Sequence, residues 1–193
     1  MGSWPTHSEE LAALQRSLAA DQPPGWGPGP PGPLLVGACF VCFPRGHEGV
    51  GTAGDPAWAS AVLLRGRHRG GSRVVTGSAG GPYVPGLLAM REGPLLEAAV
   101  RGLSRFPDVL LVNATGRDHP RRAGLATHLG AVLGLPSVGV THRPLLAAGE
   151  WPEDQGGAAS PLRLEGELVG YWLRTRQGRR PLAVHAGWRT SPD

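Results

Sequence analysis

The sequence predicts an α/β protein in which a mixed β-sheet packs against helices. Three strand-like apolar runs, separated by turns rich in Gly and Pro, are typical of an antiparallel meander. A strand, a helix and another strand follow the meander, and this alternation favours some parallel pairing. With 193 residues, of which 40% are hydrophobic and 18% charged, the chain is long enough for one globular domain with a buried core.

The N-terminal segment predicts a short amphipathic helix over residues 8–20. Ser8 can cap this helix, and Leu11, Leu14 and Leu18 are spaced to share one face.

The tract that follows, residues 21–33, predicts a linker, because it is rich in Pro and Gly and has little to bury. We therefore expect an N-terminal helix and linker over residues 1–33, and a single domain over residues 34–193.

The remaining elements follow in the order that the fold class requires. The meander strands are predicted at residues 34–43, 59–65 and 72–78. The later elements are a helical region at 86–103 interrupted at Gly93 and Pro94, a strand at 108–114, a helix at 123–134 closed by Gly134, and strands at 137–140, 162–175 and 181–185.

The charge balance favours an anionic partner. The formal net charge is +4, the pI is about 10.0, and all 19 basic residues are arginine. Arginine can grip a phosphate with two parallel hydrogen bonds. The absence of lysine is explained by a GC-rich genome, in which arginine replaces lysine. Such a genome does not explain the net positive charge.

Neither a signal peptide nor a membrane span is predicted. Glu9 and Glu10 precede the first apolar stretch where a signal peptide would be basic, and no apolar run approaches the ~20 residues that cross a bilayer. We expect a soluble, cytoplasmic protein.

Cys39 and Cys42 have the C-x-x-C spacing of redox and metal sites. On a strand, however, side chains three apart point to opposite faces. The pattern therefore favours two small buried hydrophobic residues over a paired or metal-binding site.

Glu92 is unusual because it shares a helical face with Leu88, Leu95 and Ala99. A carboxylate on an apolar face is costly unless it is paired or binds a metal. The alternatives are a helix broken at Pro94, which would turn Glu92 to solvent, or an ion pair with Arg91 or Arg101.

The segment Pro82, Tyr83, Val84, Pro85 and Gly86 predicts a stiff loop before a helix. Rigid apolar wedges of this kind are inserted between stacked bases by nucleic-acid-binding proteins. A stiff turn around a buried tyrosine is the alternative.

A polar segment at residues 112–124 lies between a strand end and a helix start, where α/β sheets favour ligand sites. Arg121 and Arg122 would attract phosphate there. An ordinary crossover loop with a structural His119 is the alternative.

Together these segments resemble endonuclease V from about residue 34 to residue 191. That family has an early G-A-D-V, P-Y-[IV]-P-G-F-L with F-R-E-x-P-x-L, V-D-G-x-G-x-x-H-P-R-R-x-G-x-A-x-H-x-G, P-x-x-G-V-A-K and a late G-H-R-x-S, all in the order found here. The resemblance implies an RNase H-like fold, a mixed sheet flanked by helices. It also implies Mg²⁺- or Mn²⁺-dependent cleavage near inosine in DNA or RNA, with single-stranded or lesion-containing strands as partners.

The resemblance assigns family roles to individual positions, and most of these positions are replaced. Glu92 stands at the family's metal-binding glutamate, and His119 and the loop from Pro82 to Gly86 are retained. The replaced catalytic positions are Cys39 and Asn113 for two aspartates, His142 for a lysine and Trp188 for a histidine. A thiol is a poor Mg²⁺ ligand, and an amide lacks the charge of a carboxylate.

The leading hypothesis is therefore a catalytically impaired relative that still binds nucleic acid through the wedge and its arginines. One alternative is an active nuclease with Asp118 as a substitute metal ligand beside Glu92, since His185 would face away from Trp188. Another is an interaction protein in which Trp188 fills the old catalytic pocket. The family also continues into a further helix after its last motif, so we expect one flank of the core to be uncovered.

Overall fold

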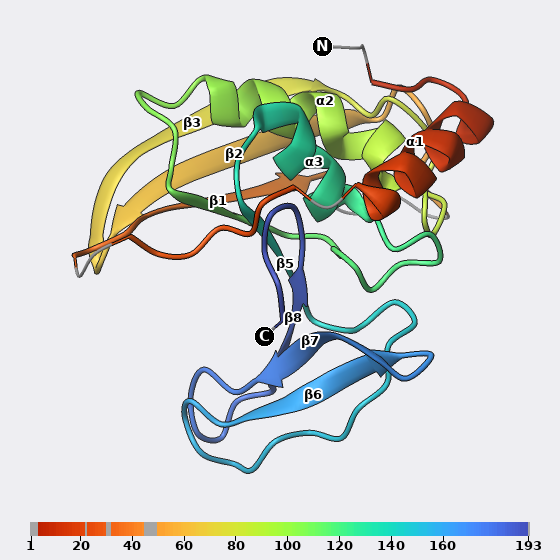
Figure 1. Ribbon diagram of the computed structural model, residues 1–193. Coiled ribbons are helices and arrows are strands. Elements are labelled where there is room, and N and C mark those ends of the chain that lie inside the picture. The colour runs from red at the N-terminus through yellow and green to blue at the C-terminus, as the bar shows by residue number, and fades with distance from the viewer. Residues whose placement is uncertain (1–3, 22, 30–31, 45–49, 193) are drawn as a thin grey trace.

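A single eight-stranded mixed sheet runs through the molecule in the strand order β3-β2-β1-β4-β5-β8-β7-β6 (Figure 1). This computed structural model describes residues 4–21, 23–29, 32–44 and 50–192. The strands are β1 (Leu35–Cys42), β2 (Pro56–Arg65), β3 (His68–Ser78), β4 (Val109–Val112), β5 (Ser137–Thr141), β6 (Ala159–Leu164), β7 (Glu167–Leu173) and β8 (Leu182–Ala186).

The strand pairing confirms the predicted combination of a meander with parallel strands. β1, β2 and β3 pair antiparallel, whereas β4 pairs parallel with both β1 and β5. The prediction of one strand over residues 162–175 was wrong, because β6 and β7 form an antiparallel hairpin. Its turn contains Glu165 at φ 53° and Gly166 at φ 84°, and this left-handed pair ends the strand.

Among the residues described, three helices accompany the sheet: α1 (Ser8–Ala20), α2 (Leu88–Arg101) and α3 (Leu125–Leu133). α1 has the predicted bounds, although His7 and not Ser8 occupies its N-cap position. α3 ends as predicted at Gly134, which adopts the left-handed conformation at φ 67°.

α2 is one continuous helix, so the predicted interruption at Gly93 and Pro94 was wrong. A proline inside a helix removes one N–H donor and crowds the carbonyl four residues earlier. Here the Gly80 N–H donates to the Arg91 carbonyl at 3.0 Å, and a Cβ at Gly80 would lie 2.3 Å from the Met90 oxygen. The loop at Gly80 thus packs closely against the backbone of α2 in the turn before Pro94.

The helices cover one face of the sheet. α2 contacts β1, β2 and β3, α3 contacts β4 and β5, and α1 lies against α2 and α3 (Figure 1). The main core lies between these layers and includes Cys39, Ala61, Leu96, Leu110 and Leu129. A smaller core lies in the β6–β8 region around Leu162, Val169 and Trp172.

The opposite face of the meander carries no helix within the described residues. Phe40, Ser60 and Val74 are register partners across β1, β2 and β3, so they share this face. Phe40 is 47% exposed and Val74 is 59% exposed. Large apolar side chains are therefore in contact with solvent here. In the described part of the chain, no helix has the length and apolarity that crossing a membrane requires.

Candidate active site and nucleic-acid interface

Cys39 lies on the helix-covered face of β1, where it is 4% exposed. Burial, together with the nearby Glu92 carboxylate, raises the pKa of its thiol to about 12. Cys39 is therefore a neutral thiol at physiological pH. Cys42 is exposed and also free, so the prediction of two buried cysteines holds only for Cys39.

Glu92 is half-buried on α2, and desolvation raises the pKa of its carboxyl to about 7, with Arg91 opposing the shift. Arg91 itself donates to Asp55 at 2.9 Å and to the carbonyls of Thr52 and Gly81. Within the residues that the structure describes, no hydrogen bond or ion pair reaches the Glu92 carboxylate. Neither alternative holds. The helix continues past Glu92, Arg91 pairs with Asp55, and Arg101 Nε donates to Glu97 at 2.7 Å.

Asn113 follows β4 directly and is exposed. Its N–H donates to the Cys39 carbonyl at 3.1 Å, so the two replaced aspartate positions lie at neighbouring strand ends. Asn113 also lines a cavity of about 370 Å³ together with Cys39 and the exposed His142. The structure thus brings three of the four replaced positions together.

Asp118 does not fit the role of a substitute metal ligand. Its side chain is fully buried, and its carboxylate accepts three backbone N–H groups, from Leu145 at 2.5 Å, Leu146 at 2.9 Å and Ala147 at 2.7 Å. One of its oxygens also lies 3.7 Å from Nδ1 of the buried His185. Asp118 therefore fixes the loop after β5 and leaves no accessible oxygen for a metal.

The donors at these positions do not fit a hard divalent cation. Mg²⁺ and Mn²⁺ prefer several ionised carboxylate oxygens. Of the positions that the family resemblance marks, only Glu92 carries an accessible carboxylate, and its raised pKa leaves part of it protonated at neutral pH. The described residues contain no group of three or more His, Cys, Asp or Glu side chains that could hold a metal.

The wedge, defined as Pro82 to Gly86, is exposed and firmly anchored. Tyr83 is 48% exposed and Val84 is 38% exposed, so the alternative of a turn around a buried tyrosine is wrong. At the base of the wedge, the Gly86 carbonyl accepts from His119 Nε2 at 3.0 Å, Arg121 Nη2 at 2.9 Å and Gln15 Nε2 at 3.2 Å. Three donors on one carbonyl hold the loop in place.

His119 acts as a neutral clamp in this arrangement. Burial lowers its pKa to about 4. Nδ1 accepts the Arg121 N–H at 3.1 Å, so Nε2 carries the proton that is donated to Gly86. His119 also lines a cavity of about 280 Å³ with Tyr83 and Asn113. The wedge therefore shares this cavity with one of the replaced positions, Asn113.

Sequence reasoning missed Gln15 of α1. It is 1% exposed, donates to Gly86 and accepts from Arg121 Nε at 2.6 Å. The only available signal was its spacing of four from Leu11, which places a polar side chain on the buried helical face. Such a residue needs partners, but the sequence does not indicate which ones.

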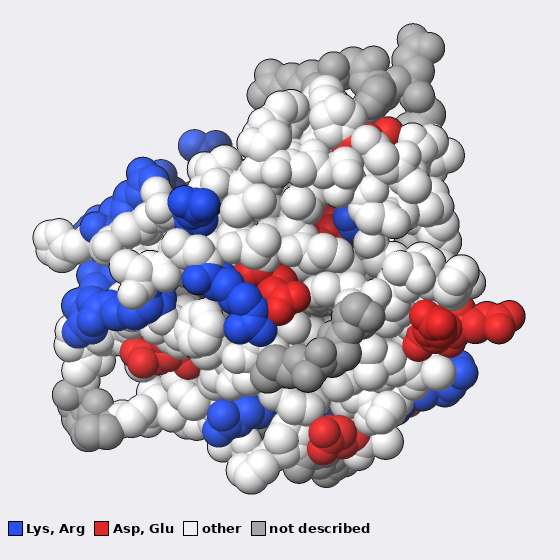
Figure 2. Space-filling model, turned by 90° about the horizontal axis from the view of Figure 1, so that it is seen from above, with Lys and Arg blue, Asp and Glu red and all other residues white. Residues whose placement is uncertain are grey.

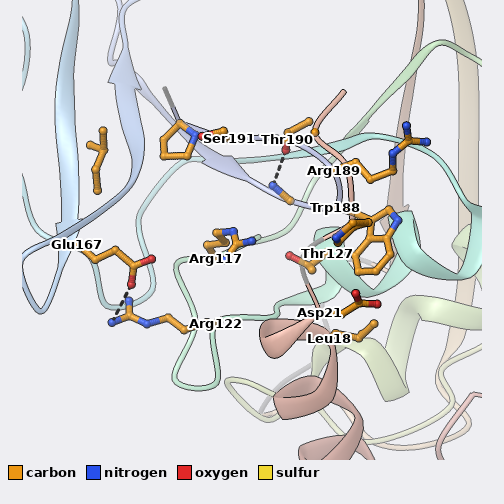
Figure 3. Close-up of a pocket in the computed structure, with 15 residues that line it drawn as sticks. Leu18, Asp21, Arg117, Arg122, Thr127, Glu167, Trp188, Arg189, Thr190 and Ser191 are labelled. Atoms are coloured by element: carbon orange, nitrogen blue, oxygen red, sulfur yellow. Dashed lines mark hydrogen bonds and ion pairs between the residues drawn. The ribbon is translucent and has the colours of Figure 1, made fainter. Parts of the chain in front are cut away.

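Arg122 and Trp188 lie away from this site, in a third cavity (Figure 3). Arg122 Nη2 donates to Glu165 at 2.9 Å, whereas Arg121 reaches the base of the wedge. The hypothesis of an interaction protein predicted that Trp188 fills the pocket at the replaced catalytic positions. Trp188 does not line the cavities that contain Cys39, Asn113 and His142. The backbone N–H of Trp188 donates to Ser137 Oγ at 2.9 Å, and the Trp188 Cβ packs beside Gly130 of α3.

Basic side chains gather towards one side of the surface shown in Figure 2. The tip of the β2–β3 hairpin lies on this side (Figure 1). The exposed arginines of this hairpin are Arg65, Arg67, Arg69 and Arg73. Such a cluster attracts an anionic chain without regard to its sequence.

Comparisons with known proteins agree with this architecture. The Endonuclease V family model matches residues 50–193. Endonuclease V of Streptomyces coelicolor is 36% identical over 190 residues, covering 96% of this chain and 78% of that protein. The crystal structure of endonuclease V from Streptomyces avermitilis superposes with a TM-score of 0.81 at 35% identity, covering 97% of this chain and 80% of that one.

A more distant structure is that of Ciona intestinalis endonuclease V in complex with a 24mer DNA containing an inosine followed by a ribo-adenosine. It is 22% identical, has a TM-score of 0.70 and shares the fold over 95% of this chain and 84% of its own. The predicted fold class is confirmed, because the mixed sheet and its three helices match endonuclease V structures. From the family model, the identities and the fold together, the chain belongs to the endonuclease V family.

Proposed function

We propose that this protein binds nucleic-acid strands that carry a deaminated base and does not cleave them by the family's metal-dependent route. One observation carries the proposal. An exposed wedge is anchored by three hydrogen bonds on Gly86 and shares a cavity with Asn113. The Asn113 N–H donates to the Cys39 carbonyl, so both replaced aspartate positions lie on this side of the sheet end.

Binding is supported by the geometry of the wedge. Tyr83 and Val84 present apolar surface to solvent, and Pro82 and Pro85 limit the backbone freedom that would be lost when a strand binds. A pre-ordered loop of this kind suits insertion beside an unstacked base. The inosine-containing DNA bound by the Ciona relative supports the choice of lesion.

Impaired cleavage is supported by the chemistry of the site. Hydrolysis of a phosphodiester by this family needs carboxylates that hold a metal and activate water. Here a neutral buried thiol and an uncharged amide stand at two of those positions. The loss of one preorganised group at a catalytic centre costs about 10²- to 10³-fold in rate, and two are replaced.

The test uses a labelled single strand with one deoxyinosine and a matched strand with deoxyguanosine in its place. Binding is measured without metal at low and at moderate salt, and cleavage with Mg²⁺ and then Mn²⁺, beside the Streptomyces coelicolor enzyme. We expect preference for the inosine strand, affinity that falls steeply with salt, and no cleavage.

Tyr83→Ala should weaken inosine-strand binding roughly tenfold, since stacking on an aromatic ring is worth about 1–3 kcal/mol per base. Phe106→Ala is the matched control, because Phe106 is also an exposed aromatic residue at 45% exposure but lies outside the wedge. Absence of strand binding at low salt would refute the binding proposal. Metal-dependent cutting one phosphodiester past the lesion, abolished by Glu92→Ala, would show that the protein is an active nuclease.

A further inference from the structure

A cavity of about 430 Å³ lies at the C-terminal end of α1 (Figure 3). It is formed by the end of α1, the start of α3, the loop after β4, β7 and the residues that follow β8. Gln15 of α1 lines the wedge cavity, whereas Leu18 and Asp21 line this one. The residues that matter for its chemistry are Arg117, Arg122, Thr127, Glu167, Trp188 and Arg189.

Two buried polar atoms of this cavity have no partner within the described chain. Thr127 is 4% exposed, and its Oγ1 makes no hydrogen bond. Arg122 Nη1 is buried and likewise makes none. Buried donors without partners are rare and costly in native proteins. Both atoms belong to residues that line the same cavity, and in Figure 3 the Thr127 hydroxyl points towards the space where Arg117 lies.

The free nitrogen of Arg122 is held in position by the other half of its guanidinium. Nη2 donates to Glu165 at 2.9 Å and to the Leu164 carbonyl at 3.3 Å, and it lies 3.5 Å from Glu167. These contacts fix the guanidinium plane through Nη2 alone. Nη1 is thereby left as a pre-positioned donor.

Arg117 adds a second cation. Its backbone N–H donates to the Ala186 carbonyl at 2.8 Å, which ties this loop residue to β8. No hydrogen bond or ion pair engages its side chain within the described chain, and Figure 3 places it between Arg122 and Thr127. Arg189 also lines the cavity, with its Nε donating to the Pro24 carbonyl at 3.2 Å.

The unpaired cation of the cavity favours an anion. Three arginines line the cavity together with Asp21 and Glu167, and Arg122 lies beside both Glu165 and Glu167. Within the described chain no ion pair engages the Arg117 guanidinium. Thr127 is in the first turn of α3, where the helix dipole also favours negative charge.

We propose that this cavity binds a phosphate group through Arg117, Arg122 Nη1 and the Thr127 hydroxyl. A phosphate offers several acceptor oxygens to donors that converge from different directions, and arginine suits it better than any other cation. The phosphate comes either from a mononucleotide or from a strand diester. The site lies apart from the wedge, so it stands independently of the proposed function.

The test titrates the full chain with inorganic phosphate and with thymidine 5′-monophosphate, at low ionic strength, by isothermal titration calorimetry. Arg117→Gln should weaken both affinities roughly tenfold, because one charge-assisted hydrogen bond is lost. Arg105→Gln is the matched control, since it removes the same charge from an exposed position outside the cavity and should change neither affinity.

Thr127→Val provides a second, nearly isosteric test. Its hydroxyl has no partner in the free protein, so the substitution should weaken phosphate binding several-fold without lowering the melting temperature. No heat with either ligand at millimolar concentration would overturn the proposal. Affinities that are the same in the parent, Arg117→Gln and Thr127→Val would overturn it as well.

A short oligothymidylate without a 5′-phosphate separates the two sources. A mononucleotide site loses affinity for the monophosphate alone in Arg117→Gln, whereas a strand site loses affinity for the oligonucleotide too. Tyr83→Ala should leave phosphate affinity unchanged. If the parent protein binds phosphate but does not bind the inosine strand, the result contradicts the proposed function and not this one.

Discussion

At the residue scale, Glu92 reduces stability at neutral pH. Its folded-state pKa of about 7 lies above the ordinary 4.5, so the folded protein holds a proton that the unfolded chain releases. This contribution to stability is fully present below pH 4.5 and is lost as pH rises through 7. Glu92→Gln should therefore raise the free energy of unfolding by about 1–3 kcal/mol at pH 8 and leave it nearly unchanged at pH 4.

Urea unfolding at the two pH values measures this effect. Glu150→Gln, at an exposed position, is the control and should change stability little at either pH. An equal gain for Glu92→Gln at both pH values would mean that the carboxyl is not protonated in the folded protein.

The replaced aspartates offer a second residue-scale prediction. The double variant Cys39→Asp with Asn113→Asp should bind Mn²⁺ measurably more tightly than the parent, because it places one carboxylate near Glu92 and a second at the neighbouring strand end. Calorimetric titration with Mn²⁺ measures the gain. Cys42→Asp with Asn113→Asp is the matched control, since Cys42 lies on the same strand but is exposed on the opposite face. Equal affinity in the two double variants would contradict the assignment of Cys39 to the metal centre.

The sequence indicates where some of the candidate site residues lie in the fold, but not where others lie. Cys39, Glu92 and Asn113 follow from motif and strand order, because neighbouring strand ends must meet. Asp118 and Trp188 do not, because their partners come from distant segments. The carboxylate of Asp118 is bound by backbone of residues 145–147, and Trp188 packs beside α3. No local pattern specifies such contacts.

At the scale of elements, α1 is the support on which the wedge rests. Gln15→Leu would remove one donor to Gly86 and the acceptor of Arg121 Nε, leaving buried polar groups unsatisfied. We expect a loss of about 1–3 kcal/mol in the free energy of unfolding and faster hydrogen exchange in residues 82–86.

Hydrogen exchange followed by mass spectrometry, with urea unfolding, measures both effects. Gln155→Leu is the control, because Gln155 is exposed and should leave the wedge unchanged. Unchanged exchange in the wedge of Gln15→Leu would show that His119 and Arg121 hold Gly86 without help from α1.

Helix and strand bounds were predicted correctly where they depend on the residue pattern of the element itself. They were predicted wrongly where they depend on packing against other segments or on an unusual turn. The bounds of α1 follow from its own leucine spacing. The continuity of α2 through Pro94 does not, since it accompanies close packing against Gly80. The β6–β7 turn was missed because Glu165, a residue that seldom adopts a positive φ, precedes Gly166 there.

At the scale of the whole molecule, buried histidines make stability depend on pH. Burial lowers the pKa of His119 and of His128 from 6.5 to about 4, and the pKa of His185 is lowered as well. The unfolded chain therefore binds more protons than the folded one between pH 6.5 and 4, and stability falls as pH falls through this window. His119 and His128 contribute about 2 kcal/mol each, and together they outweigh the opposite contribution of the single Glu92.

Urea midpoints at pH 7, 5.5 and 4.5 should decline in that order. A His128→Asn variant should show a shallower decline, because one titrating group has been removed. A midpoint that stays constant from pH 7 to 4.5 would contradict the neutral state of these side chains.

The uncovered sheet face also affects how the protein behaves in concentrated solution. Phe40, Trp58 and Val74 present an apolar surface, and the formal net charge of +4 is a modest source of repulsion between molecules. Near the isoelectric point of about 10.0 that repulsion vanishes. Molecules can then stack through their bare sheets, so solubility should be lowest in alkaline buffer and should recover as the pH is brought towards neutrality.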